Sequence, residues 1–141
     1  MRQHERPGED AGLPELFWAV ARRLRHSSQE NLAQWDISPS QSRVILVLGR
    51  HERIRLSELS DHLRIAPRST TEVVDALQEK GLVERQADPT DRRATLVTLT
   101  EAGRGILKQL QQARHSNSVA LFEPLSDTDR DRLATILRKL I

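Results

Sequence analysis

Residues 88–103 read DPTDRRATLVTLTEAG, and this stretch decides the fold that the sequence predicts. Its first half is rich in aspartate and contains a proline, which is typical of a tight turn. The β-prone runs LVERQ and ATLVTL stand on either side of the turn, so we expect a β-hairpin. Two adjacent arginines, Arg92 and Arg93, fall at the tip of this hairpin. Side chains at a hairpin tip bury nothing, so we expect these two to reach for a partner.

Two helices are predicted directly before the hairpin. Residues 55–63, RLSELSDHL, space leucines along one helical face, with Ser57 as the expected N-cap. Residues 65–81, IAPRSTTEVVDALQEKG, place Pro67 in the first turn of a longer helix and Gly81 at its stop. A short helix, a tight connection and a longer helix with a polar N-terminal half form a helix-turn-helix. A helix-turn-helix followed by a hairpin is a winged helix.

A helix with clear capping signals precedes this motif. In the stretch SPSQSRVILVLG, Ser38 is the expected N-cap, Pro39 fits N1, and Gln41 at N3 completes a capping box. The apolar residues that follow are typical of a buried central helix. Gly49 is expected just past the end of this helix as its C′ stop.

Three further amphipathic helices lie outside the winged helix. They are expected over about 13–33, from the cap Thr100 to Pro124, and from the cap Ser126 to the C-terminus. One winged helix offers little surface to cover three more apolar stripes. We therefore expect the stripes to pack against the same helices of a second copy. The alternative is that they pack within a single chain.

These elements predict a mainly α-helical fold with a small β-hairpin wing. We expect a flexible tail over 1–12 and a single domain over 13–141. Within that domain, residues 38–99 are expected to form the winged-helix lobe, and residues 13–34 and 100–141 the dimerisation helices. A two-fold dimer would present two wings and two recognition helices to a pseudo-palindromic DNA site, with half-sites about 34–36 Å apart.

The composition excludes several classes of protein. The chain has 141 residues, a formal net charge of +2 and no cysteine, which excludes disulfides, cysteine zinc sites, iron–sulfur clusters and thiol redox sensing. No apolar run approaches the roughly 20 residues of a membrane span. The polar start MRQHERPGEDAG lacks the apolar segment of a secretory signal, so we expect a cytoplasmic protein. Nearly all basic residues are arginine, which binds phosphates and guanine edges well but also accumulates through codon bias.

The order of the elements and three stretches of sequence resemble the MarR family of bacterial transcriptional regulators. STTEVVDALQEKGLVER resembles the recognition helix of that family, DPTDRRATLVTLTEAG its wing signature, and LSDTDRDRLATILRKL its last helix. Together these stretches extend the resemblance over nearly the whole chain. The resemblance implies a homodimer that binds palindromic operator DNA, usually as a repressor. In many members of that family, a small aromatic or other organic ligand releases the DNA.

The recognition helix is expected to contact DNA through one exposed face. Its buried face is expected to comprise Thr70, Val73, Val74 and Leu77. On the opposite face, Arg68 fits a guanine edge, and Ser69 and Thr71 fit phosphates or bases. Glu72 departs from the pattern of the similar family, which commonly has arginine there. Glu72 is expected to pair with Arg68 one turn earlier, to accept a hydrogen bond from a cytosine amino group, or to lie on a solvated face.

The wing arginines are expected to enter the minor groove, where negative potential attracts guanidinium groups. Arg92 is expected to be the outermost contact, with Arg93 beside it. Asp88 and Asp91 bracket the turn and are expected to shape it. Asp91 is expected to form an ion pair with an arginine, a role that the resemblance supports. The alternative is a solvated turn that is merely rich in charge.

A column of side chains on the first helix is a candidate wall of a ligand pocket. Trp18, Arg22 and His26 follow one another at intervals of one helical turn. Ligands of the similar family lodge beside this helix, which implies a pocket at this column. The alternative is that these residues pack in the dimer interface.

The sequence contains no motif of an enzyme or a metal site. The histidines fall in no metal-binding spacing, and neither a glycine-rich phosphate loop nor a nucleophile elbow is present. We therefore expect no catalytic activity, metal or cofactor. The main alternative function is a winged-helix protein-interaction module that does not bind DNA. Glu72, Asp75 and the low net charge favour that alternative, whereas Arg68, Arg92 and Arg93 favour double-stranded DNA as the partner.

Overall fold

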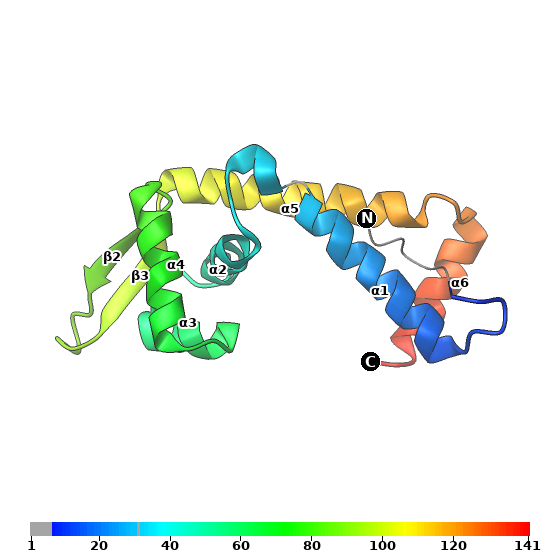
Figure 1. The fold of residues 1–141 in the computed structure, drawn as a ribbon, viewed down its shortest axis with the longest axis horizontal. Helices are drawn as coiled ribbons and strands as arrows, with labels where there is room; N and C mark the ends of the chain where they lie inside the picture. The colour runs from blue at the N-terminus through cyan, green and yellow to red at the C-terminus, as the bar shows by residue number, and fades with distance from the viewer. Residues whose placement is uncertain (1–6, 31) are drawn as a thin grey trace. The chain divides into compact units, whose positions relative to one another are not determined.

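The chain forms two compact units, which are described separately. The computed structural model describes residues 7–30 and 32–141 (Figure 1). The core unit comprises residues 31–112, and the terminal unit comprises the rest of the chain. The predicted winged-helix lobe, 38–99, falls inside the core unit. Helix α5 (Glu101–Phe122) begins in the core unit and ends in the terminal unit.

Helix α2 (Pro39–Gly49) is buried in the core unit and begins at the predicted capping box. The backbone N–H of Gln41 donates to the Ser38 hydroxyl (3.2 Å), and the N–H of Ser38 donates to Gln41 Oε1 (3.1 Å). The predicted stop was wrong, because Gly49 is the last helical residue and not the C′ residue. A Cβ at Gly49 would lie 2.6 Å from Leu107 Cδ2, so a larger residue here would require the Leu107 side chain to move.

Helices α3 (Leu56–Leu63) and α4 (Pro67–Glu79) form the predicted helix-turn-helix. Arg64 reverses the chain between them in the left-handed region, with φ 55°. The predicted N-cap of α3, Ser57, was wrong, because the helix already begins at Leu56. The chain enters α3 directly from a two-residue strand, β1 (Ile54–Arg55), so the last strand residue occupies the cap position and makes no side-chain cap hydrogen bond.

A three-stranded antiparallel sheet follows α4 in the core unit. Gly81 ends α4 as predicted, with φ 73°. Strands β2 (Val83–Ala87) and β3 (Thr95–Leu99) form the predicted hairpin. Strand β1 adds to β3 with Ile54 opposite Val97, giving the order β1–β3–β2, and the sequence did not predict this third strand. The start of α3 is thereby attached to the sheet from which the wing projects (Figure 1).

The hydrophobic core lies entirely in the core unit. Buried apolar side chains run from Leu32, in the short 3-10 helix η1 (Leu32–Trp35), to Leu110 in the first half of α5. The hydroxyl of Ser60 donates to Thr70 Oγ1 (2.9 Å) in the interior and joins α3 to α4. This bond satisfies both buried hydroxyl groups, which would be costly to leave unpaired.

The passage from β3 into α5 is held by Thr100, the predicted cap. The N–H of Gly103 donates to Thr100 Oγ1 (3.1 Å), and the Thr100 hydroxyl donates to the carbonyl of Gly81 (2.6 Å). A Cβ at Gly103 would overlap the backbone carbonyl of Leu82. A glycine is therefore required at this close approach of α5 to the sheet.

The terminal unit contains α1 (Leu13–Glu30), the end of α5 and α6 (Asp127–Arg138). Ser126 caps α6 as predicted, because its hydroxyl accepts the N–H of Asp129 (3.2 Å). Helix α1 is shorter than the predicted 13–33. Half of the predicted tail cannot be compared, because residues 1–6 lie outside the described residues.

The terminal unit encloses no core of its own. None of its described side chains is buried. All the exposed large apolar side chains of the described chain belong to it: Leu13, Leu16, Phe17, Trp18, Val20, Val119, Ile136, Leu137, Leu140 and Ile141. No helix within the described ranges is long and apolar enough to cross a membrane.

Candidate nucleic-acid interface

The N-terminal half of α4 presents polar side chains on an exposed face. On the predicted inner face, Val73 is half-buried, and the three buried residues are Thr70, Val74 and Leu77. On the outer face, Arg68, Ser69 and Glu72 are exposed. Thr71 is half-buried, and its hydroxyl donates to the carbonyl of Pro67 (3.0 Å).

Arg68 and Glu72 form the predicted pair one helical turn apart. The Nε atom of Arg68 lies 3.8 Å from Glu72 Oε1, and the two side chains are 92% and 70% exposed. Water screens such a pair, so it adds little to the stability of the fold. The pair matters instead for the chemistry of the surface, because it places a guanidinium beside a carboxylate on the outer face of α4.

Arg85 fastens strand β2 to α4. Its Nη1 donates to Gln78 Oε1 (2.6 Å), and its Nη2 donates to Asp75 Oδ1. The charge of Asp75, which the sequence analysis counted against DNA binding, is therefore balanced within the core unit. Sequence reasoning did not single out Arg85, because its partners lie on a different element.

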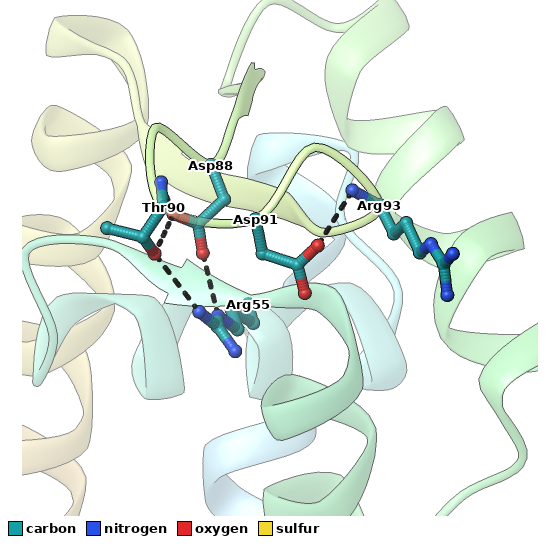
Figure 2. Close-up of polar contacts among 5 residues, drawn as sticks. All are labelled: Arg55, Asp88, Thr90, Asp91 and Arg93. Atoms are coloured by element: carbon teal, nitrogen blue, oxygen red, sulfur yellow. Dashed lines mark hydrogen bonds and ion pairs between the residues drawn. The ribbon is translucent and has the colours of Figure 1, made fainter.

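Asp88 fastens the base of the wing and is only 6% exposed. Its Oδ1 accepts the backbone N–H (2.9 Å) and the hydroxyl (2.7 Å) of Thr90, and its Oδ2 accepts from Arg55 Nε (2.7 Å) (Figure 2). Its own N–H donates to the carbonyl of Ala94 across the turn (3.1 Å). Arg55, which sequence reasoning missed, thus joins β1 to the wing turn. This geometry suits the wing-shaping role predicted for Asp88.

The same contacts hold the pKa of Asp88 below its ordinary range. The largest cause is the hydrogen bond from the Thr90 backbone N–H, followed by that from the Thr90 hydroxyl. Burial acts in the opposite direction, while the hydrogen bond and the positive charge of Arg55 lower the pKa further. Asp88 is therefore ionised at neutral pH.

Asp91 does not form the predicted ion pair with any arginine among the described residues. Its Oδ1 accepts the backbone N–H of Arg93 (3.0 Å), and its carbonyl accepts the N–H of Ala94 (3.0 Å). A short aspartate side chain reaches a backbone donor two residues ahead more easily than a guanidinium group that extends outward. Arg92 and Arg93 are both exposed, and Figure 2 shows the Arg93 side chain extending away from Asp91 and Asp88.

A hollow of about 310 Å³ lies between the wing turn and the start of α3. Arg55 and Arg93 line it together with Ser57, Thr95 and a single acidic residue, Asp91. Arg55 is paired with Asp88 and the Asp91 carboxylate shares the lining with Arg93, so the charges around this hollow balance.

The winged-helix geometry of the core unit matches a known family of proteins. The MarR family model matches residues 37–95, which run from two residues before α2 to the first residue of β3. Over these residues the chain is similar to the MarR family.

Similarity to individual MarR-family proteins extends beyond the residues matched by the family model. The transcriptional repressor MprA of Escherichia coli (strain K12) is 28% identical over 142 residues, covering 99% of this chain and 81% of MprA. Wild-type MarR from E. coli in its apo form has a TM-score of 0.83 and 28% identity, over 95% of this chain and 99% of that chain. A mutant MarR from E. coli complexed with operator DNA has a TM-score of 0.69 and 28% identity, over 92% and 93% of the two chains.

The predicted ligand-pocket residues all lie on α1. Trp18, Arg22 and His26 are exposed, and Trp18 is 54% exposed. The ring of Trp18 meets that of Phe17 edge to face, with centroids 6.0 Å apart. A pocket at this column stays a prediction.

Two histidines that are distant in the sequence lie close together in the core unit. The ring centroids of His51 and His62 are 5.1 Å apart, with the planes inclined by 50°. The described residues contain no group of three or more side chains suited to hold a metal ion. No sequence signal predicts this contact, because the chain passes through β1 and α3 between the two residues.

Proposed function

We propose that this chain is a MarR-family protein, a sequence-specific transcriptional repressor that binds a pseudo-palindromic operator as a homodimer. The observation that carries the proposal is the placement of two exposed arginine groups in one unit. Arg68 lies on the outer face of α4, and Arg92 and Arg93 lie at the wing tip. The two ion pairs of Arg85 and Arg55 fasten the wing to the helix-turn-helix. The two DNA-contacting elements therefore approach a duplex in a fixed arrangement.

In this proposal the N-terminal half of α4 enters the major groove. Arg68 donates to a guanine edge, as bidentate guanidinium groups do. Ser69 donates its exposed hydroxyl to a phosphate or a base edge. Thr71 is the weaker contact of the two hydroxyl residues, because its hydroxyl hydrogen is already donated to the carbonyl of Pro67.

The wing arginines enter the adjacent minor groove in this proposal. Arg92 and Arg93 carry no acidic partner side chain among the described residues, so their charge is available to the duplex.

The homodimer is proposed from the apolar surface of the terminal unit. Large apolar side chains as exposed as Phe17 (53%), Ile136 (55%) and Leu140 (75%) are unusual on a chain that acts alone. A second copy offers the same helices and would cover these side chains around a two-fold axis. The dimer would then match the two-fold symmetry of a palindromic operator.

Repression and its release are the finer parts of the proposal. MprA, which is similar over nearly all of this chain, is named a transcriptional repressor. Release of the DNA would follow binding of a small aromatic or other organic ligand at Trp18, Arg22 and His26. Titration with aromatic carboxylates, monitored by tryptophan fluorescence, tests for this binding. No fluorescence response to any of them would contradict a pocket at Trp18.

Binding to the DNA upstream of the chain's own gene tests the proposed function. Gel shifts between about 50 and 200 mM salt should give nanomolar binding that weakens steeply with salt. Arg92→Ala should weaken binding several-fold and reduce the salt slope by about one. Arg104→Ala, an exposed arginine on α5, is the charge-matched control and should leave the slope unchanged. If the wild-type chain shows no salt-dependent, sequence-dependent binding to DNA, the result would favour the protein-interaction module instead.

A further inference from the structure

The Arg68–Glu72 pair stands where a major-groove edge would meet α4, and its chemistry restricts which edge fits. Both side chains are largely exposed, and the guanidinium and carboxylate atoms are 3.8 Å apart. The pair presents hydrogen-bond donors and acceptors side by side. The inference drawn from it rests on the proposed function, because it concerns the operator that the chain reads.

A carboxylate on a DNA-facing surface needs a donor, because the surrounding phosphates repel it. Asp75, on the next turn of α4, receives hydrogen bonds from Arg85 within the protein. Glu72 has Arg68 as its sole charged partner among the described residues, at a distance that leaves its oxygens open to further donors. Glu72 therefore differs from Asp75 in retaining acceptor capacity toward a bound duplex.

Base edges in the major groove supply few donors. Only the N4 amino group of cytosine and the N6 amino group of adenine donate there. A guanidinium group requires two neighbouring acceptors for a bidentate contact, and the N7 and O6 atoms of guanine provide them. O6 of guanine and N4 of cytosine are Watson–Crick partners and so lie at hydrogen-bond distance from one another. The charged atoms of Arg68 and Glu72 have a similar spacing, 3.8 Å.

We propose that Arg68 and Glu72 act together as a reader of one G·C base pair in each operator half-site. Arg68 donates to N7 and O6 of the guanine, and Glu72 accepts from N4 of the paired cytosine. An A·T pair at this position lacks the neighbouring acceptors for Arg68 and places a thymine methyl group in the groove. Glu72 thus determines specificity by accepting a hydrogen bond that no thymine can donate.

In vitro selection from random duplexes with the full-length wild-type protein tests this proposal. The selected sites should share one required G·C pair in each half-site. Replacing that pair by A·T in both half-sites should weaken binding at least about tenfold. Glu72→Gln should reduce this penalty to the part that comes from Arg68, because a glutamine amide can donate to O4 of the thymine whereas a carboxylate cannot. Glu79→Gln removes an equal charge from the exposed end of the same helix and should retain the full penalty.

The possible results separate this proposal from the proposed function. Selected sites without a required G·C pair would overturn the reader while leaving DNA binding intact. An unchanged A·T penalty in Glu72→Gln, with an unchanged melting temperature, would do the same. Failure of the wild-type protein to enrich any sequence would overturn both.

Discussion

The core unit and the terminal unit differ in how their apolar side chains are used. The core unit buries many of its apolar residues, and side chains such as Val44, Ile45 and Leu59 have no exposed surface. The terminal unit leaves its large apolar residues exposed on α1, α5 and α6. Both units are built from amphipathic helices, so helix amphipathicity alone does not distinguish them.

This difference shows which part of the chain is complete as a monomer. The core unit satisfies its apolar and polar groups internally, and none of its described buried side-chain N or O atoms lacks a hydrogen bond. The terminal unit does not satisfy its apolar surface within the described chain. Its stability is therefore expected to depend on a partner, whereas that of the core unit depends on internal packing.

The largest expected effect comes from placing charge on the apolar surface of the terminal unit. The double substitution Ile136→Glu and Leu140→Glu would bury two carboxylates in the proposed dimer interface, which is strongly unfavourable. The variant should sediment as a monomer at micromolar concentration while the wild type sediments as a dimer. Operator affinity should fall at least about a hundredfold, because the two half-sites are then bound independently.

The neighbouring surface of the same helix provides the control for this change. Thr135 is exposed on α6, about 100° around the helix from Ile136. Thr135→Glu adds a similar charge and should leave both the dimer and the operator affinity unchanged. A double variant that remains a dimer would remove the proposed contrast between the two units.

A smaller effect is expected from crowding the close contact between α5 and the sheet. Gly103→Ala would drive a methyl group into the Leu82 carbonyl, a backbone atom that cannot rotate away. The free energy of unfolding should fall by about 3 kcal/mol. Gly105→Ala, two residues later in the same helix, meets no atom within 4 Å and should instead raise it by up to about 1 kcal/mol. Urea denaturation of both variants measures the two changes, and equal effects would contradict the close approach.

The smallest expected effect is a pH dependence that originates at the base of the wing. The pKa of Asp88 is lowered in the folded chain, so its contribution to stability is present above the unfolded value, about 3.9, and is lost as the pH falls through the lower folded value. The melting temperature of the wild type should exceed that of Asp88→Asn by a constant margin from pH 7 to about pH 5. Below about pH 4 the margin should shrink. A margin that does not change over this whole range would show that the ionised carboxylate is not what stabilises the turn.

Local signals in the sequence predicted most of the secondary structure. The caps at Ser38, Thr100 and Ser126 are confirmed, because each joins atoms no more than three residues apart. The stop at Gly81 is confirmed for a similar reason, since only the local backbone conformation decides it. The errors at Gly49 and Ser57 arose where a distant segment overrides the local pattern.

The predictions for the candidate site show the same difference between local features and contacts of distant segments. The exposed arginines of α4 and the wing, and the Arg68–Glu72 pair, were predicted from helix periodicity and turn chemistry, although their roles toward DNA stay predictions. The contacts that position the wing were not predicted. Arg55 reaches Asp88 across 33 positions of the chain, and Arg85 reaches Asp75 from a strand to a helix.

The sequence by itself therefore determined the order of the helices and turns, most of their boundaries and most of the outward-facing residues, because those properties depend on hydrogen bonds and periodicity within a few residues. Only the tertiary structure decided that β1 joins the sheet, that Asp88 and not Asp91 holds an arginine, and that the charge of Asp75 is balanced. These contacts depend on the register and packing of distant segments. Long side chains such as arginine can reach many partners, and only the folded backbone selects one of them.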